Sequence, residues 1–67
     1  MDPHGYGQRV LVVDDDANIR SLLSVLLRYE GYNVFEAGDG LEAVHELKKR
    51  YFDVVISDFR MPRFDGM

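Results

Sequence analysis

The sequence contains no cysteine among its 67 residues, so disulfide bonds and thiolate metal sites are excluded. It has no apolar run of the roughly 20 residues that a membrane-spanning helix needs. Its first residues lack the basic start and the apolar segment of a signal peptide. Basic residues are in the minority, eight against twelve acidic ones, and the formal net charge is −4. These absences favour a cytoplasmic protein and argue against binding of this segment to membranes or nucleic-acid phosphates.

The chain has little length in which to bury a core. A protein of about 60 residues buries only about 60% of the surface that its unfolded chain exposes, so one domain is the most we expect. Residues 1–8 contain glycine and proline without periodicity and are expected to form a flexible leader before a single domain at 9–67. Five aromatic residues near the ends of the expected strands and helices are expected to pack: Tyr29, Tyr32, Phe35, Tyr51 and Phe52.

Hydrophobic spacing predicts three strands and two helices in alternation. The continuous apolar run within 9–13 is typical of a strand buried on both faces. Leucines recur at helical spacing between 18 and 29, and Gly31 follows them as a residue suited to ending a helix. The remaining expected elements are strands at 32–37 and 53–58 and a helix from 41 to about 50, with Asp39 as its candidate N-cap.

This order, β-α-β-α-β, predicts an α/β fold. Strands that alternate with helices of about a dozen residues pair in parallel and are joined by right-handed crossovers. With the first strand in the centre, the strand order is 2-1-3 and one helix covers each face. Ligands of such sheets bind beyond the C-terminal ends of the strands, where the winding direction reverses. We therefore expect the functional site between the ends of the first and third strands.

Three carboxylates follow those two strands. Asp14 and Asp15 end the first apolar run, and Asp58 ends the run of the third strand. Carboxylates gathered in one crevice repel one another unless a cation lies among them, and oxygen ligands of this kind favour Mg²⁺. The neighbouring Asp16 is expected to cap the first helix or to be solvated rather than to bind the metal.

Three stretches of the sequence carry a resemblance to a known family. They are the Val-Val-Asp-Asp sequence at 12–15, the Asp-Gly pair at 39–40, and the D-x-x-M-P-x-x-D-G pattern at 58–66. Together they resemble the first half of a response-regulator receiver domain, which is a flavodoxin-like, doubly wound parallel sheet. The resemblance extends over nearly all of residues 9–67 and implies a partial receiver domain, truncated after the third strand.

The resemblance implies a role in a two-component phosphorelay. Asp58 would be the phosphoacceptor for a sensor histidine kinase, so the chain would be a phosphoprotein and not an enzyme. Asp15 would bind Mg²⁺ directly and Asp14 directly or through water, with Asp58 and the backbone carbonyl of Arg60 as further ligands. The family's Thr or Ser after a fourth strand and its Lys after a fifth strand have no counterpart among these 67 residues.

Two other functions remain open from the sequence. Asp14 and Asp16 have the two-residue spacing of the Asp-x-Asp motif found in Mg²⁺-dependent phosphohydrolases that use an aspartyl nucleophile. Alternatively, the chain is a half-domain that assembles with itself and does not signal. The third strand would present Val54, Val55 and Ile56 on an apolar edge, a template for pairing with another chain, which predicts a homodimer.

Overall fold

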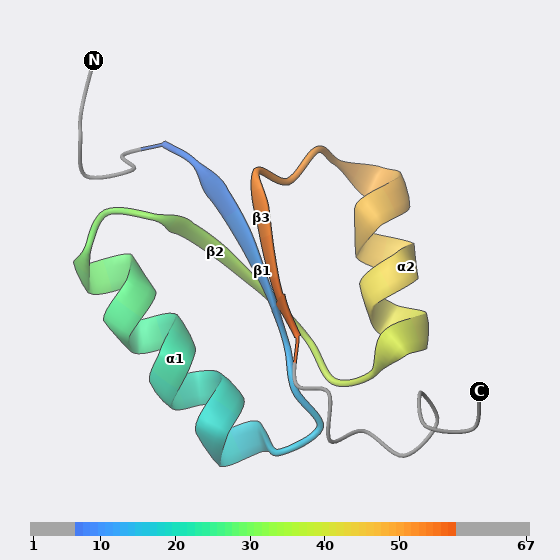
Figure 1. The fold of residues 1–67 in the computed structure, drawn as a ribbon, viewed down its shortest axis with the longest axis horizontal. Helices are drawn as coiled ribbons and strands as arrows, with labels where there is room; N and C mark the ends of the chain where they lie inside the picture. The colour runs from blue at the N-terminus through green and yellow to red at the C-terminus, as the bar shows by residue number, and fades with distance from the viewer. Residues whose placement is uncertain (1–6, 58–67) are drawn as a thin grey trace.

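The computed structural model describes residues 7–57, in which three strands and two helices alternate along the chain (Figure 1). The elements are β1 (Arg9–Val13), α1 (Ala17–Tyr29), β2 (Asn33–Ala37), α2 (Gly40–Lys49) and β3 (Val54–Ser57). The expected order is confirmed, and α1, β2, α2 and β3 each begin one residue from the expected start. The expected leader residues 1–6 and the expected strand end at Asp58 lie outside the described residues.

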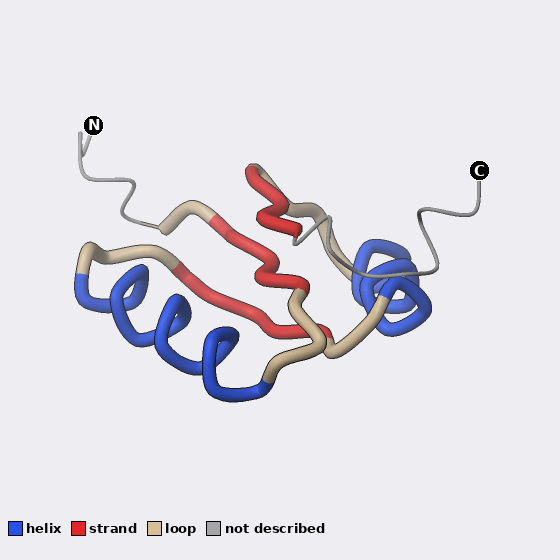
Figure 2. The backbone as a smooth tube through the Cα atoms, turned by 60° about the horizontal axis from the view of Figure 1, so that its bottom comes forward, coloured by secondary structure: helices blue, strands red, loops and turns tan. Residues whose placement is uncertain are grey.

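The three strands form a parallel sheet in the order β2-β1-β3. The last residue of β1, Val13, lies opposite Ala37 of β2 and Ser57 of β3. Figures 1 and 2 show α1 and α2 on opposite faces of this sheet. The expected strand order, the parallel pairing and the placement of one helix on each face are confirmed.

The central strand, β1, supplies the core of both faces. On the face covered by α1, the buried cluster consists of Val10, Val12 and Val34, with the partly buried Leu23, Leu27 and Tyr32 packed against it. On the face covered by α2, the cluster consists of Leu11, Val13, Ala37, Ala43 and Phe52. The side chains of residues 10–13 are at most 3% exposed. The continuous apolar run of β1 therefore reflects burial on both faces, as expected.

Aspartates begin both helices, and a glycine follows the first. The Asp16 carboxylate caps α1 by accepting a hydrogen bond of 2.9 Å from the Asn18 amide. The Asp39 carboxylate caps α2 by accepting one of 2.8 Å from the Glu42 amide, as expected. Gly31 follows α1 with a φ of 98°, a left-handed conformation that glycine adopts without strain. Within residues 7–57, neither helix is long and apolar enough to cross a membrane.

The aromatic residues pack only in part as expected. Phe35 and Phe52 meet edge to face, with ring centroids 5.4 Å apart, and the Arg50 guanidinium lies 4.4 Å from the centre of the Phe35 ring. Tyr29 and Tyr51 are instead 88% and 73% exposed, so the expectation was wrong for these two residues. Tyr29 lies two positions, about 200° around the helix, from the packed Leu27. Tyr51 precedes the buried Phe52 in the connection between α2 and β3.

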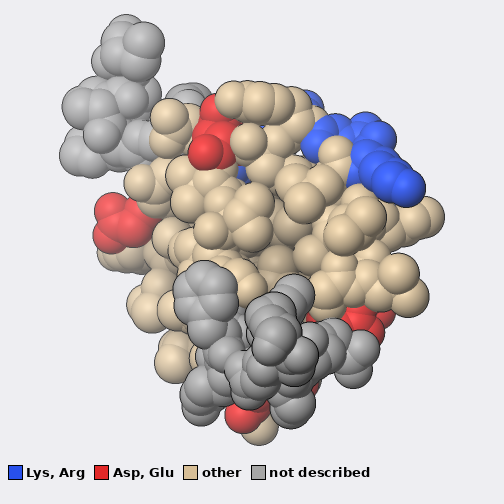
Figure 3. Space-filling model, turned by 45° about the vertical axis from the view of Figure 1, so that its right-hand side comes forward, with Lys and Arg blue, Asp and Glu red and all other residues tan. Residues whose placement is uncertain are grey.

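Apolar side chains remain at the surface on and around β3. The three apolar residues of β3 are between 36% and 45% exposed. The two helices add further exposed apolar side chains, namely Ile19, Leu22, Val25, Leu26, Leu41, Val44 and Leu47. Figure 3 shows a face of the molecule on which a broad area carries neither acidic nor basic side chains. Single exposed apolar residues are common, whereas adjacent ones, such as the three of β3, are typical of a surface that contacts something else.

Candidate functional site

The C-terminal ends of the strands lie at one edge of the sheet. β1 and β3 end level with each other, because Val13 of β1 is in register with Ser57 of β3. Asp14 and Asp15 continue the chain from β1. Of the other two expected site residues, Asp58 directly follows Ser57 in the sequence. Both Asp58 and Arg60 lie outside the described residues, so the structure does not place their side chains.

Asp14 is held at its backbone and at its side chain. Its amide donates a hydrogen bond of 3.1 Å to the Ala37 carbonyl of β2, so the sheet pairing continues past Val13. Its carbonyl accepts a bond of 2.8 Å from Nη1 of Arg20. Its carboxylate Oδ1 accepts one of 2.9 Å from the Asp16 amide. The residue is only 4% exposed, and the bond to Oδ1 offsets part of the desolvation of the buried carboxylate.

The three consecutive acids have three different environments. Asp14 is buried, Asp15 is exposed, and Asp16 is occupied as the N-cap of α1. The expectation that Asp16 caps the helix is confirmed. Among residues 7–57, the structure gives a hydrogen bond to Oδ1 of the Asp14 carboxylate and none to Oδ2. The loop after β1 thus offers two carboxylates, one fixed by the fold and one on the surface.

The carboxylates of Asp14 and Asp15 provide the type of ligand atom, oxygen, and the number of acidic groups that a hard divalent cation prefers. Mg²⁺ prefers oxygen ligands, keeps several waters, and is commonly bound by one or two carboxylates. Within residues 7–57 no three histidine, cysteine or acidic side chains are grouped closely enough to enclose a metal ion. A site built on Asp14 and Asp15 therefore needs its remaining ligands from water or from outside the described residues.

Arg20 is a site residue that the sequence analysis did not single out. Its Nη1 donates to the Asp14 carbonyl, and its Nε donates to Oε1 of Glu36 on β2 over 3.2 Å. Arg28 reaches the same Glu36 carboxylate at 3.8 Å but has no contact with Asp14 in the described part of the chain. The available signal was the position of Arg20 in the first turn of a helix that directly follows an acidic loop.

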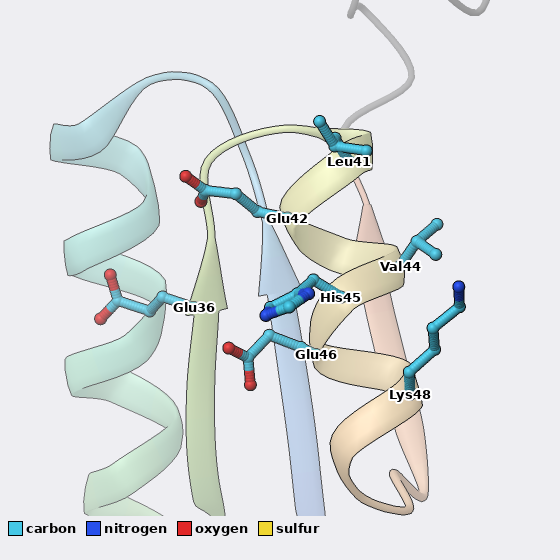
Figure 4. Close-up of a pocket in the computed structure, with 7 residues that line it drawn as sticks. All are labelled: Glu36, Leu41, Glu42, Val44, His45, Glu46 and Lys48. Carbon is cyan, nitrogen blue, oxygen red and sulfur yellow. The ribbon is translucent and has the colours of Figure 1, made fainter.

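A separate hollow of about 610 Å³ lies along α2 and Glu36 of β2 (Figure 4). Its three acids are engaged within the fold. Glu36 pairs with Arg20, the Glu42 carboxylate accepts a bond of 2.7 Å from the Gly38 amide, and Glu46 pairs with Arg50. The one histidine in its lining is exposed and belongs to no metal-ligand group of residues 7–57. The hollow therefore offers no unengaged acid and no metal-ligand group among the described residues.

Comparisons with known proteins agree with one another. A family model described as "Response regulator receiver domain" matches residues 10–67. The transcriptional regulatory protein PdtaR of Mycobacterium tuberculosis (strain ATCC 25618 / H37Rv) is 49% identical over 61 residues, which cover 90% of this chain and 30% of the relative. The transcriptional regulatory protein ZraR of Escherichia coli O157:H7 is 45% identical over 58 residues, covering 87% of this chain and 13% of the relative.

Two proteins of Vibrio cholerae are also similar. The solved structure of the chemotaxis response regulator CheY4 superimposes with a TM-score of 0.79 and 46% identity, covering 84% of this chain and 47% of that one. The CAI-1 autoinducer sensor kinase/phosphatase CqsS is 38% identical over 60 residues, which cover 90% of this chain and 9% of the relative. The chain thus spans less than a third of these curated relatives and about half of the solved one.

Proposed function

Because the chain belongs to the response regulator receiver domain family, we propose that it accepts a phosphoryl group on Asp58 in a reaction that requires Mg²⁺. The observation that carries this proposal is the register of the sheet, which sets Val13 and Ser57 side by side at the ends of β1 and β3. In the sequence, Asp14 and Asp15 follow the first of these strand ends and Asp58 follows the second. Level strand ends of this kind are where open parallel sheets bind ligands.

The proposed reaction transfers the phosphoryl group from nitrogen to oxygen. A carboxylate oxygen of Asp58 attacks the phosphorus of a phosphohistidine. The new P–O bond forms as the P–N bond breaks, and the released imidazole nitrogen takes up a proton. The product is an acyl phosphate on Asp58, the same use of a carboxylate nucleophile as in aspartyl-phosphate ATPases.

Mg²⁺, when bound, neutralises charge on the transferring group, which is the main need of phosphoryl transfer. The exposed Asp15 would hold it directly. Asp14, whose carboxylate is held by the Asp16 amide, would hold it directly or through water. The remaining ligands in this proposal are the Asp58 carboxylate and the backbone carbonyl of Arg60.

The phosphodonor in this proposal is a sensor histidine kinase. The phosphoryl transfer is proposed to take place in the cytoplasm. Support for the donor comes from the family and from the relative named as a sensor kinase/phosphatase, which contains a segment similar to this chain. The absence of cysteine is compatible with a reducing compartment.

The environment of Asp16 does not favour the phosphohydrolase alternative. An Asp-x-Asp enzyme needs its second aspartate as an acid–base group at the substrate. The Asp16 carboxylate instead accepts bonds from the amides of Asn18 and Ile19 at the start of α1. Sustained turnover of a simple phosphate ester would support that alternative, whereas a single stable phosphorylation supports the receiver function.

Mass spectrometry tests the proposal. The chain is incubated with a small-molecule phosphodonor, with and without Mg²⁺, and the modified residue is located by fragmentation. We expect one phosphoryl group, on Asp58 and only in the presence of Mg²⁺. Labelling at another residue, or labelling that is indifferent to Mg²⁺, would contradict the proposal.

Mg²⁺ binding itself gives a separate prediction. In a titration followed by nuclear magnetic resonance, the amides of residues 14–16 are expected to shift first. Replacing Asp15 with asparagine should weaken the affinity about tenfold or more, since even outer-shell partners of metal ligands contribute that much. Glu30→Gln removes the same charge at the opposite end of α1 and serves as the control. Equal affinities of the two variants would remove Asp15 from the site.

We further propose that β3 pairs with β3 of a second copy. Each of its three apolar residues is more than a third exposed, and within residues 7–57 β3 lies at the edge of the sheet, where a strand presents unpaired backbone donors and acceptors. A two-fold axis through Val55 would set Val55 opposite its own copy and Val54 opposite Ile56 of the second copy. This antiparallel register matches apolar side chains on both faces, because residues facing each other across paired strands point to the same side.

The prediction for this homodimer concerns Val55. Val55→Lys would place two like charges opposite each other at the axis, so the dissociation constant is expected to rise on the order of a hundredfold, equivalent to about 3 kcal/mol. Leu41→Lys makes the same change on α2, at a residue that is 80% exposed, and should leave assembly unchanged. Sedimentation at micromolar concentration measures both. A wild-type chain that is a folded monomer under these conditions would contradict the dimer.

A further inference from the structure

The Arg20 side chain links α1, β2 and the acidic loop at 14–16 that follows β1. It extends from α1, its Nη1 donates to the carbonyl of Asp14 at 2.8 Å, and its Nε donates to Glu36 of β2 at 3.2 Å. The side chain is 22% exposed, and its bond to the Asp14 carbonyl is part-buried, so that bond is shielded in part from competing water. A guanidinium can hold two acceptors in a fixed relative geometry, which a lysine ammonium cannot do.

Arg20 also closes a ring of hydrogen bonds around the loop. Its own amide donates to the Asp16 carbonyl at 2.9 Å. The Asp16 amide donates to Oδ1 of Asp14, and the Asp14 carbonyl accepts from the Arg20 guanidinium. Each of the three residues is therefore tied to the other two. This ring sets the orientation of the peptide bond between Asp14 and Asp15. It therefore also sets the direction in which the Asp15 side chain extends from the backbone.

The loop after β2 leaves room for the guanidinium at Gly38. A Cβ atom at this position would lie 3.2 Å from Nη1 of Arg20 and 3.3 Å from Oε1 of Glu42. The Gly38 amide donates to that same Glu42 oxygen at 2.7 Å, which holds the loop in place. The guanidinium thus lies against the backbone of the loop after β2 at Gly38, while it donates to the Asp14 carbonyl in the loop after β1.

We propose that Arg20 is a positioning residue for metal binding by Asp14 and Asp15, an inference that rests on the proposed Mg²⁺ site. A loop that is already ordered binds a cation without the loss of entropy that ordering the loop upon binding would cause. Sites held by supporting hydrogen bonds are accordingly tighter than those whose ligands move freely. Arg20 supplies such support without touching the metal.

The positive charge of Arg20 disfavours cation binding, whereas its positioning of the loop favours it. A positive side chain near a cation site repels the cation, so loss of this charge alone would strengthen Mg²⁺ binding or, because Glu36 pairs with it, leave binding unchanged. Loss of positioning would weaken binding. The direction of the change therefore separates the two effects.

The test compares Arg20→Gln with Arg28→Gln. Arg28 also pairs with Glu36, at 3.8 Å, and donates to the Val34 carbonyl, but it does not contact the acidic loop. We expect Arg20→Gln to weaken Mg²⁺ affinity about tenfold, within the range for outer-shell partners. Arg28→Gln should stay within about twofold of the wild type, because surface ion pairs contribute little. Arg20→Lys keeps the positive charge but lacks the planar guanidinium that can bind two acceptors. Its Mg²⁺ affinity is expected to lie between those of the wild type and Arg20→Gln.

A second readout needs no metal. In Mg²⁺-free protein, hydrogen exchange at the Asp14 and Asp16 amides should quicken in Arg20→Gln and Arg20→Lys relative to the Leu27 amide. A general loss of stability would quicken all three alike. Arg20 variants with wild-type Mg²⁺ affinity, or with uniform changes in exchange, would overturn the inference alone. A wild-type chain that binds no Mg²⁺ would overturn the proposed metal site and this role together.

Discussion

Replacement of Asp58 with asparagine is expected to abolish acyl-phosphate formation in this chain. The amide oxygen of asparagine is neutral and far less nucleophilic than a carboxylate, and its attack on phosphorus would not yield the same stable product. Incubation of both proteins with a small phosphodonor and Mg²⁺, followed by intact-mass measurement, should show one added phosphoryl group on the wild type and none on Asp58→Asn.

Asp53→Asn is the matched control for that experiment. Asp53 precedes β3 and lies at the opposite end of the strand from Asp58, where its carboxylate accepts a hydrogen bond of 2.8 Å from the Arg9 amide. Asparagine retains an oxygen acceptor there, so labelling of this variant should equal that of the wild type. Equal labelling of Asp58→Asn and the wild type would instead assign the phosphoacceptor role to another residue.

Much of the fold could be predicted because local patterns and global topology agree in this sequence. The four consecutive apolar residues of β1 are buried on both faces, which is the environment that such a run requires. Asp39 and Gly31 marked helix ends through capping chemistry that depends only on near neighbours. The exposure of Tyr29 and Tyr51 could not be predicted from their nearness to core residues, because it depends on the phase of the backbone at each position.

The site could be predicted only where it follows from the strand ends. Parallel pairing alone places residues that follow β1 and β3 at one edge, which led to Asp14 and Asp15. It could not show that Asp14 is buried while Asp15 is exposed, since this difference comes from the turn into α1. Nor could it find Arg20, because the contact with Glu36 joins residues 16 positions apart on different elements. Asp58 and Arg60 remain predictions.

Stability limits every functional experiment on this chain. Folded proteins are stable by about 0.05–0.15 kcal/mol per residue, and domains below about 70 residues rarely gain more than about 3–5 kcal/mol from a core. The two core clusters share β1, so a defect in this strand affects both faces of the sheet. Substitutions at the surface and at the acidic loop are therefore safer tests of function than any change in β1.

Leu11→Ala is expected to unfold most of the protein. Leu11 is fully buried in the centre of β1 and packs in the cluster that contains Phe52 and Ala43. Truncation of a buried leucine costs about 2–5 kcal/mol, because it removes apolar contacts and leaves a cavity, and that is comparable to the whole stability of so small a fold. Leu41→Ala, at a residue 80% exposed on α2, should change stability by no more than about 0.5 kcal/mol. Urea unfolding followed by circular dichroism measures both variants, and equal unfolding midpoints would show that β1 is not the centre of the core.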